Sequence, residues 1–175
     1  MSRPALLVID AQNDYLPGGM FPLANMDKKV ERMLAGIEKA KKQGAPVILV
    51  QHIADPSVGM APFFNEGTEG AKIIPEIRAA APDAPVVIKH YADAFEGTDL
   101  LGVLQGLDVN ELIIEGMMTQ NCVTFTALAR PADDFDKVTV LTDASTTATE
   151  ILHKIAIMAL STRVDLGTVD EIMGE

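Results

Sequence analysis

The chain has little of what marks secreted scaffolds, membrane proteins and nucleic-acid-binding proteins. It contains one cysteine, so no internal disulfide can form, which excludes a disulfide-stapled scaffold and favours a reducing compartment. No apolar run approaches the ~20 residues that span a bilayer. The net charge is −11, whereas general binding to nucleic acid or an anionic membrane needs clustered Lys and Arg. We therefore expect a cytoplasmic protein without a nucleic-acid or membrane partner.

Sequence signals for repeats, linkers and nucleotide cofactors are also missing. The glycine-rich stretch 59–70 has neither a GxGxxG pattern nor a Walker lysine, so nucleotide binding has little support. His52, His90 and His153 lie far apart in the sequence, which favours ordinary surface or loop roles for each of them. The alternative for His90, which is next to Lys89, is a place in the lining of a site. The length of 175 residues suits one domain, and we expect a single domain over residues 1–175.

The hydrophobic pattern predicts strands and helices that alternate. Uninterrupted apolar runs such as 5–9 are typical of strands covered on both faces. The expected strands are 5–9, 46–52, 85–89, 112–115, 137–142 and 164–168. The first expected helix begins after Asn25 or Asp27 and ends at Gly44. Further helices are expected at 98–105, 123–130 and 150–162, and one helical turn near 71–77 inside a long loop. This alternation predicts a three-layer α/β/α, Rossmann-like domain with a mainly parallel sheet of about six strands.

The only cysteine lies where a predicted strand passes into a helix. The segment Gly116-Met-Met-Thr-Gln-Asn-Cys122 follows the apolar run 111–115. Unsatisfied backbone N–H groups and the positive end of the helix dipole would favour the thiolate there. The alternative is a small, buried and inert core residue, and a lone cysteine taken by itself favours that alternative.

Three reactive side chains fall at the carboxyl ends of predicted parallel strands, where such sheets bind ligands. Asp10 follows the first strand, Lys89 ends the third, and Cys122 lies a turn beyond the fourth. Each alone has a structural explanation, as a loop cap, a solvent-exposed cation and a core thiol. Together they suit acyl transfer: the thiolate attacks, Lys89 lowers the thiol pKa, and Asp10 accepts and returns a proton. The turn from Met117 to Cys122 offers N–H donors to an oxyanion.

These motifs resemble those of the isochorismatase-like cysteine hydrolases, a family that includes nicotinamidases, N-carbamoyl amidohydrolases and isochorismatases. The resemblance covers nearly the whole chain and rests on Ala5-Leu-Leu-Val-Ile-Asp-Ala-Gln-Asn-Asp14, on 85–90 with 94–95 and 97–98, and on 116–123. Order and spacing match the family's Asp–Lys–Cys triad. The resemblance implies that Asp10 is the general base and acid, Lys89 the electrostatic partner and Cys122 the nucleophile.

The resemblance also implies details around the triad. A non-proline cis peptide at Met117–Met118 would aim the N–H groups of Met118 and Cys122 at the oxyanion. The candidate pocket walls are Gln12, Asn13, Phe63 and Phe64. A small-molecule substrate, no cofactor and a homo-oligomer, either dimer or tetramer, are expected.

The chain departs from two branches of this family. Nicotinamidases bind a metal through an Asp-x-His pair after the second strand, whereas this chain has Gln51-His52-Ile-Ala-Asp55 there, so we expect no metal. Isochorismatases usually lack the cysteine. The leading hypothesis is a metal-independent cysteine hydrolase that cleaves a C–N bond of a small amide or carbamoyl substrate through a covalent acyl-enzyme. The alternatives are a vinyl-ether hydrolase that uses only Asp10 and Lys89, and a non-catalytic binding module.

Overall fold

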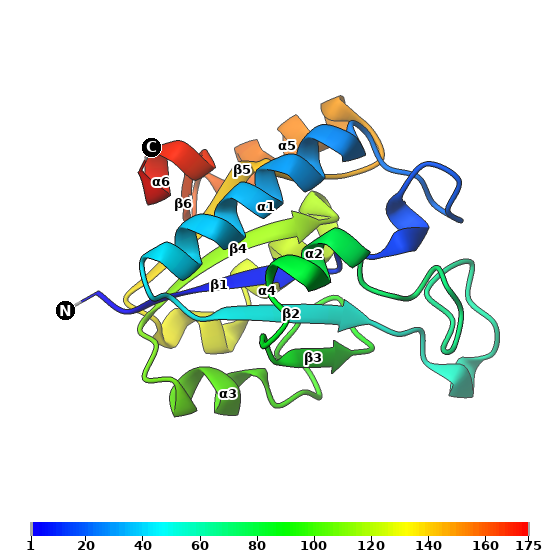
Figure 1. Cartoon of the computed structure of the whole chain (residues 1–175), viewed down its shortest axis with the longest axis horizontal. Coiled ribbons are helices and arrows are strands. Elements are labelled where there is room, and N and C mark those ends of the chain that lie inside the picture. Colours follow the sequence, from blue (N-terminus) through cyan, green and yellow to red (C-terminus); the bar gives the residue numbers. More distant parts are fainter. Residues whose placement is uncertain (1, 175) are drawn as a thin grey trace.

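Strands and helices alternate along the chain in the computed structural model, which describes residues 2–174 (Figure 1). The strands are β1 (Pro4–Ile9), β2 (Val47–His52), β3 (Val86–Lys89), β4 (Glu111–Met117), β5 (Lys137–Thr146) and β6 (Asp165–Gly167). The helices are α1 (Met26–Lys42), α2 (Pro75–Ala80), α3 (Leu100–Gly106), α4 (Thr124–Ala127), α5 (Glu150–Leu160) and α6 (Val169–Met173). No helix within residues 2–174 is long and apolar enough to cross a membrane.

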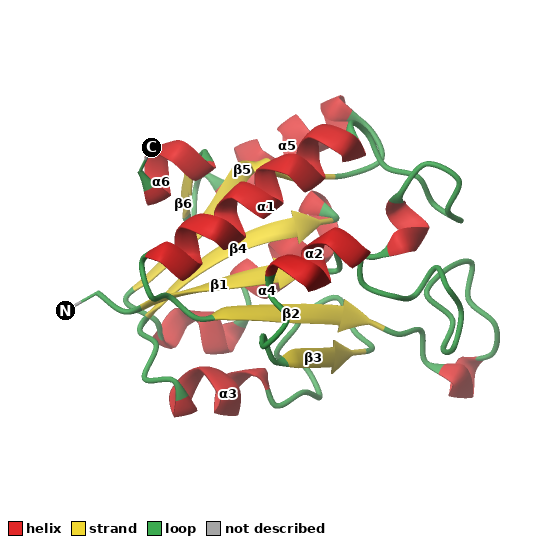
Figure 2. Ribbon diagram, in the orientation of Figure 1, coloured by secondary structure: helices red, strands yellow, loops and turns green. Residues whose placement is uncertain are grey.

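The six strands form one parallel sheet in the order β3-β2-β1-β4-β5-β6. Helices α1, α2 and α6 cover one face, and α3, α4 and α5 cover the other (Figure 2). This confirms the predicted α/β fold, and the strand order is that of a doubly wound Rossmann sheet.

Strand β1 lies in the middle of the sheet and is buried along nearly its whole length. Leu6 and Val8 pack into the core under α1, while Leu7 and Ile9 pack into the core on the opposite face. Successive side chains of a strand point to opposite faces, so a strand covered on both sides is apolar at every position. This explains the uninterrupted apolar run from which β1 was predicted.

The strand order reverses beside β1, because the chain continues to β2 on one side of it and reaches β4 on the other. Ile9 of β1 is in register with Gly116 of β4. Gly116 has a φ of 123°, and a Cβ there would overlap the carbonyl oxygen of Ile9. Only glycine therefore allows the two strand ends to come this close, at the switch point where doubly wound sheets bind ligands.

The segment after the cysteine differs from the predicted helix 123–130. Thr119–Val123 form a π-helical turn, α4 has only 4 residues, and a 3₁₀ helix follows at Arg130–Asp134. The hydroxyl of Thr124 donates to the carbonyl oxygen of Thr119 at 2.6 Å, a side-chain bond inside the wide turn. Pro131 has no N–H to continue an α-helix. The single continuous helix was therefore a wrong prediction.

Candidate active site

The structure brings Asp10, Lys89 and Cys122 together at the carboxyl ends of β1, β3 and β4. The Nζ atom of Lys89 lies 2.9 Å from Oδ2 of Asp10 and 3.2 Å from Sγ of Cys122. Asp10 and Lys89 are both 0% exposed and Cys122 is 3% exposed. Three residues that are far apart in the sequence thus form one buried ion pair in contact with a thiol.

Each of the three residues is positioned by the end of a strand. Asp10 leaves β1 with a φ of 50°, a left-handed conformation that is uncommon for residues other than glycine. Its N–H donates to the carbonyl oxygen of Val50 at 2.9 Å, which ties it to β2. Lys89 is the last residue of β3 and pairs with His52 of β2. Cys122 lies in the π-helical turn that follows β4.

The turn that carries Cys122 begins with the cis peptide that the resemblance implied. The bond between Met117 and Met118 is cis, which confirms that expectation. The carbonyl oxygen of Met118 accepts hydrogen bonds from the N–H groups of Asn121 and Val123, at 3.0 Å and 3.3 Å. These bonds hold the backbone around Cys122 close to Met118.

The environment of Cys122 favours the thiol over the thiolate. Burial, together with the negative charge of Asp10, raises the pKa of Cys122 to about 12, against the lowering effect of Lys89. Burial works to lower the pKa of Lys89, but Asp10 and Cys122 outweigh it and raise that pKa. The expected lowering of the thiol pKa by Lys89 is therefore present but is outweighed, so this environment does not favour a resting thiolate.

The carboxylate of Asp10 is buried, and its Oδ2 atom forms an ion pair with Nζ of Lys89 at 2.9 Å. The same ammonium also contacts Nδ1 of His52 at 2.9 Å, the carbonyl oxygen of Tyr91 at 2.9 Å and Sγ of Cys122 at 3.2 Å. Asp10 therefore shares the three protons of Lys89 with three other acceptors. One ion pair does not use all the acceptor positions of a carboxylate, so Asp10 can still take a proton.

His52 belongs to this site, although its place in the sequence had suggested an ordinary surface or loop role. An ammonium can only donate, so Nδ1 of His52 accepts from Lys89 and the ring proton is on Nε2. Burial, and then the charge of Lys89, lowers the pKa of His52 to about 4. The signal that could have found it is its position at the end of the second predicted strand, at the same edge of the sheet as Asp10.

Asp10, His52 and Cys122 also form a set of metal-ligand types. Their ligand atoms lie within 4.8 Å of one another. The ammonium of Lys89 lies 2.9 Å to 3.2 Å from atoms of all three residues, so it already supplies the positive charge at their centre. A divalent cation there would be repelled by Lys89. The donor set therefore does not fit a metal while Lys89 is charged.

The structure places Gln12 and Phe64 in the interior. Gln12 is fully buried, and its side-chain amide donates to the carbonyl oxygens of His52 and Ala71 at 2.8 Å and 2.7 Å. Its Oε1 atom accepts from the N–H of His52 at 2.8 Å. Phe64 is 1% exposed and packs edge-on against Tyr15, with 4.7 Å between ring centroids. Both side chains therefore pack in the interior next to the site and support the residues that form its wall.

Asn13 and Phe63 line a cavity of about 620 Å³ between the loop at 13–20 and the loop at 60–70. Buried Asp14, which the sequence did not single out, joins these two loops. Its Oδ2 accepts from the N–H of Phe64 at 2.8 Å and its Oδ1 from the N–H of Met20 at 3.2 Å. Gly70 packs so closely that a Cβ there would overlap the Asp14 carboxylate.

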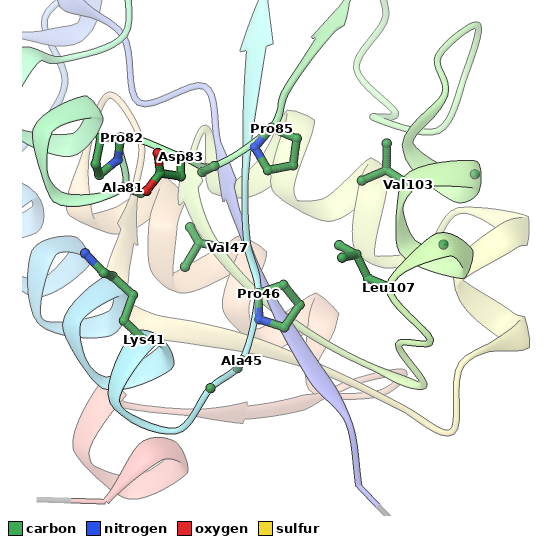
Figure 3. A pocket seen from close by; sticks show the side chains of 14 residues that line it. Lys41, Ala45, Pro46, Val47, Ala81, Pro82, Asp83, Pro85, Val103 and Leu107 are labelled. Atoms are coloured by element: carbon green, nitrogen blue, oxygen red, sulfur yellow. The ribbon is translucent and has the colours of Figure 1, made fainter.

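A larger cavity, of about 870 Å³, lies at the opposite edge of the sheet. Its lining comes from the amino-terminal ends of β2 and β3 and from α3, and includes Pro46, Pro85 and Leu107 (Figure 3). Lys41 and Asp83 are the charged residues around it. No triad residue lines it, so this cavity is separate from the triad at the carboxyl ends of the strands.

Comparison with known proteins identifies the family of the chain. A family model described as "Isochorismatase domain" matches residues 4–170. Two Arabidopsis thaliana proteins are each 31% identical over 168 residues: "Nicotinamidase 3" (90% of this chain, 80% of the relative) and "Probable inactive nicotinamidase" (88% and 86%). A crystal structure of an isochorismatase family protein from Desulfovibrio vulgaris matches with a TM-score of 0.87, at 26% identity and over 100% of both chains.

Proposed function

The chain belongs to the isochorismatase domain family, and on this basis we propose that it is a metal-independent cysteine hydrolase that cleaves a C–N bond of a small amide or carbamoyl compound. The observation that carries the proposal is the buried contact of Lys89 with both Asp10 and Cys122. A relative named as a nicotinamidase supports an amide as the substrate class.

The raised pKa of Cys122 requires that proton transfer accompany attack on the substrate. A free oxygen of Asp10 takes the Sγ proton while sulfur forms a bond to the carbonyl carbon, and the carbonyl π electrons move to its oxygen. Lys89, at 3.2 Å from Sγ, stabilises the negative charge that develops on sulfur during this step. A permanent thiolate is not needed.

The N–H groups of Met118 and Cys122 then stabilise the oxyanion, and one such donor contributes about 10²–10³-fold to the rate in comparable sites. The tetrahedral intermediate collapses as the C–N bond breaks, and protonated Asp10 returns the proton to the departing nitrogen. Water attacks the thioester carbon while Asp10 takes one proton of that water, and the second tetrahedral intermediate collapses as the C–S bond breaks. Protonated Asp10 returns its proton to the departing sulfur, which releases the acid and restores the thiol of Cys122.

The test is a screen over small amides, carbamoyl compounds and vinyl ethers with wild type, Cys122→Ala and Asp10→Asn. We expect wild type to hydrolyse an amide or carbamoyl compound and both variants to lose at least about 10³-fold in kcat. Turnover of a vinyl ether that survives Cys122→Ala but not Asp10→Asn would indicate the cysteine-independent alternative. Absence of turnover in wild type over the whole screen would favour a binding module.

A further inference from the structure

We propose that His52 is a positioning residue, which accepts one proton of Lys89, helps to aim another at Cys122 and thereby limits how strongly the ammonium engages the Asp10 carboxylate. The proposal deepens the proposed function and rests on the same triad. It concerns a side chain that the triad chemistry itself does not require.

The ammonium of Lys89 has three protons, and three hydrogen-bond acceptors surround it besides the Asp10 carboxylate. These are Nδ1 of His52 at 2.9 Å, the carbonyl oxygen of Tyr91 at 2.9 Å and Sγ of Cys122 at 3.2 Å. The protons turn together about the Cε–Nζ bond, so two acceptors fix the direction of the third proton. His52 and Tyr91 together therefore aim one N–H at the sulfur of Cys122.

Asp10 is the competing acceptor for these protons, because its Oδ2 lies 2.9 Å from Nζ, as close as Nδ1 of His52. A hydrogen bond between an ammonium and a carboxylate is stronger than one to a neutral ring nitrogen. Without the acceptor of His52, the ammonium would turn further toward Asp10. That rotation would engage the carboxylate more strongly and move a proton away from Cys122.

Hydrogen bonds to both backbone groups of His52 fix the position of its ring beside Lys89. Gln12 accepts from the N–H of His52 and donates to its carbonyl oxygen, both at 2.8 Å. His52 pairs in register with Lys89 across β2 and β3, and its ring lies 5.8 Å from the ring of Phe64. These contacts explain why Nδ1, the ring nitrogen nearer the backbone, is the one that meets the ammonium.

The acceptor role requires a neutral ring. The titratable groups that act on His52 are Lys89 and His90 from the end of β3, which disfavour its protonation, and Asp10 from the end of β1, which favours it. Burial adds to the first effect and is the largest cause. Nδ1 therefore keeps its lone pair at neutral pH.

Three substitutions of His52 distinguish the effect of its hydrogen-bond acceptor from the effect of the size of its ring. His52→Asn places Oδ1 near the position of Nδ1, His52→Gln places its oxygen nearer to the position of Nε2, and His52→Leu removes the acceptor at similar size. Gln51→Leu is the control, because Gln51 donates to the Ala71 carbonyl at 2.8 Å, as Gln12 does, but does not bond to Lys89.

The primary measurement is the rate of alkylation by iodoacetamide between pH 6 and pH 10. Cys122 is the only thiol, so the label reports on this site alone. For His52→Leu we expect about tenfold slower labelling at a given pH, which corresponds to an upward shift of about one unit in the thiol pKa. His52→Asn and Gln51→Leu should label within about threefold of wild type, and His52→Gln should resemble His52→Leu.

The second measurement is turnover of a substrate from the screen. His52→Leu should lose about 10- to 100-fold in kcat with little change in KM.

Equal labelling of His52→Leu and wild type would overturn the proposal. So would equal losses in His52→Asn, His52→Gln and Gln51→Leu, since those would indicate a structural role only. If His52→Leu does not fold, the comparison of Asn with Gln at this position decides, because both are amides and differ only in where the oxygen lies. Failure of the proposed function would be seen separately, as full turnover in Cys122→Ala, and would leave the labelling comparison intact.

Discussion

The chemistry of the site depends on how one lysine divides its protons among its neighbours. Lys89 contacts His52, Tyr91 and Cys122, and forms an ion pair with Asp10. Four acceptors thus compete for three protons, and burial together with Asp10 raises the pKa of the Cys122 thiol.

Alkylation of wild-type Cys122 should reflect the raised thiol pKa. Because burial and Asp10 raise the pKa of Cys122 to about 12, the thiolate fraction should grow about tenfold per pH unit throughout the range from pH 7 to pH 9. The measurement is the rate of labelling with iodoacetamide against pH, with denatured protein as the reference for an unperturbed thiol. A plateau below pH 8 would show that the thiol is already ionised there.

A second buried acid, Glu115 in β4, should make stability depend on pH. Glu115 is 0% exposed, its oxygens have no hydrogen-bond partner among the described residues, and burial raises its pKa well above 4.5. The folded-state pKa exceeds the unfolded one, so the stability it contributes is complete below about pH 4.5 and is lost as the pH rises through the folded-state value.

Glu115→Met removes this effect while keeping the side chain about as long. We expect the variant to be about 1–3 kcal/mol more stable than wild type at pH 8, with the difference shrinking toward pH 4. Denaturant unfolding at several pH values measures it. A difference that stays constant from pH 4 to pH 8 would contradict the account.

At the scale of elements, the site is made by the close approach of the ends of β1 and β4. Ile9 and Gly116 are in register, Asp10 follows the first, and the turn with Cys122 follows the second. The loop at 13–20 and the loop at 60–70 then meet over buried Asp14. Gly116 therefore allows the strand ends to approach each other, and the carboxylate of Asp14 joins the two loops.

Gly116→Ala should disrupt this approach. Its φ of 123° disfavours any side chain, and its Cβ would overlap the Ile9 carbonyl oxygen, so we expect a loss of about 2–4 kcal/mol in unfolding free energy. Gly106→Ala is the matched control, because nothing lies within 4 Å of a Cβ at that end of α3. Urea unfolding of both variants measures the effect, and equal stability of the two would contradict it.

Asp14→Ala should loosen the two loops without unfolding the sheet. It removes the acceptor for the N–H groups of Phe64 and Met20, each worth about 1–3 kcal/mol when left unpaired. Hydrogen exchange should then become about 10- to 100-fold faster at 16–21 and 60–68 and stay unchanged in β1 and β4. Unchanged exchange in those loops would show that Asp14 does not join them.

The sequence predicted the elements whose signals are local. The apolar runs predicted where the parallel strands end, and those carboxyl ends placed Asp10, Lys89 and Cys122 at one edge of the sheet. The π-helical turn and His52 were missed for physical reasons. A widened turn stabilised by Thr124 has no periodic signature, and the contact of His52 with Lys89 depends on the register of β2 with β3.

At the scale of the whole molecule, the carboxyl ends and the amino-terminal ends of the parallel strands carry different features. The triad lies at the carboxyl ends of the strands and is 0–3% exposed, while a cavity of about 870 Å³ lies at the amino-terminal ends of β2 and β3. With so little of Cys122 exposed, we expect part of the covering wall to move when a substrate binds. The loops joined by Asp14 border a second cavity, which Asn13 lines, so we expect the movement there.

The most direct test of the account is intact-mass analysis of the enzyme quenched during turnover of the best amide or carbamoyl substrate. Wild type should carry an added mass equal to the acyl group, which peptide mapping places on Cys122, and Cys122→Ser and Asp10→Asn should carry none. Hydrolysis of that substrate with no thioester on Cys122, at an equal rate in Cys122→Ser, would contradict the claim that this residue is the nucleophile.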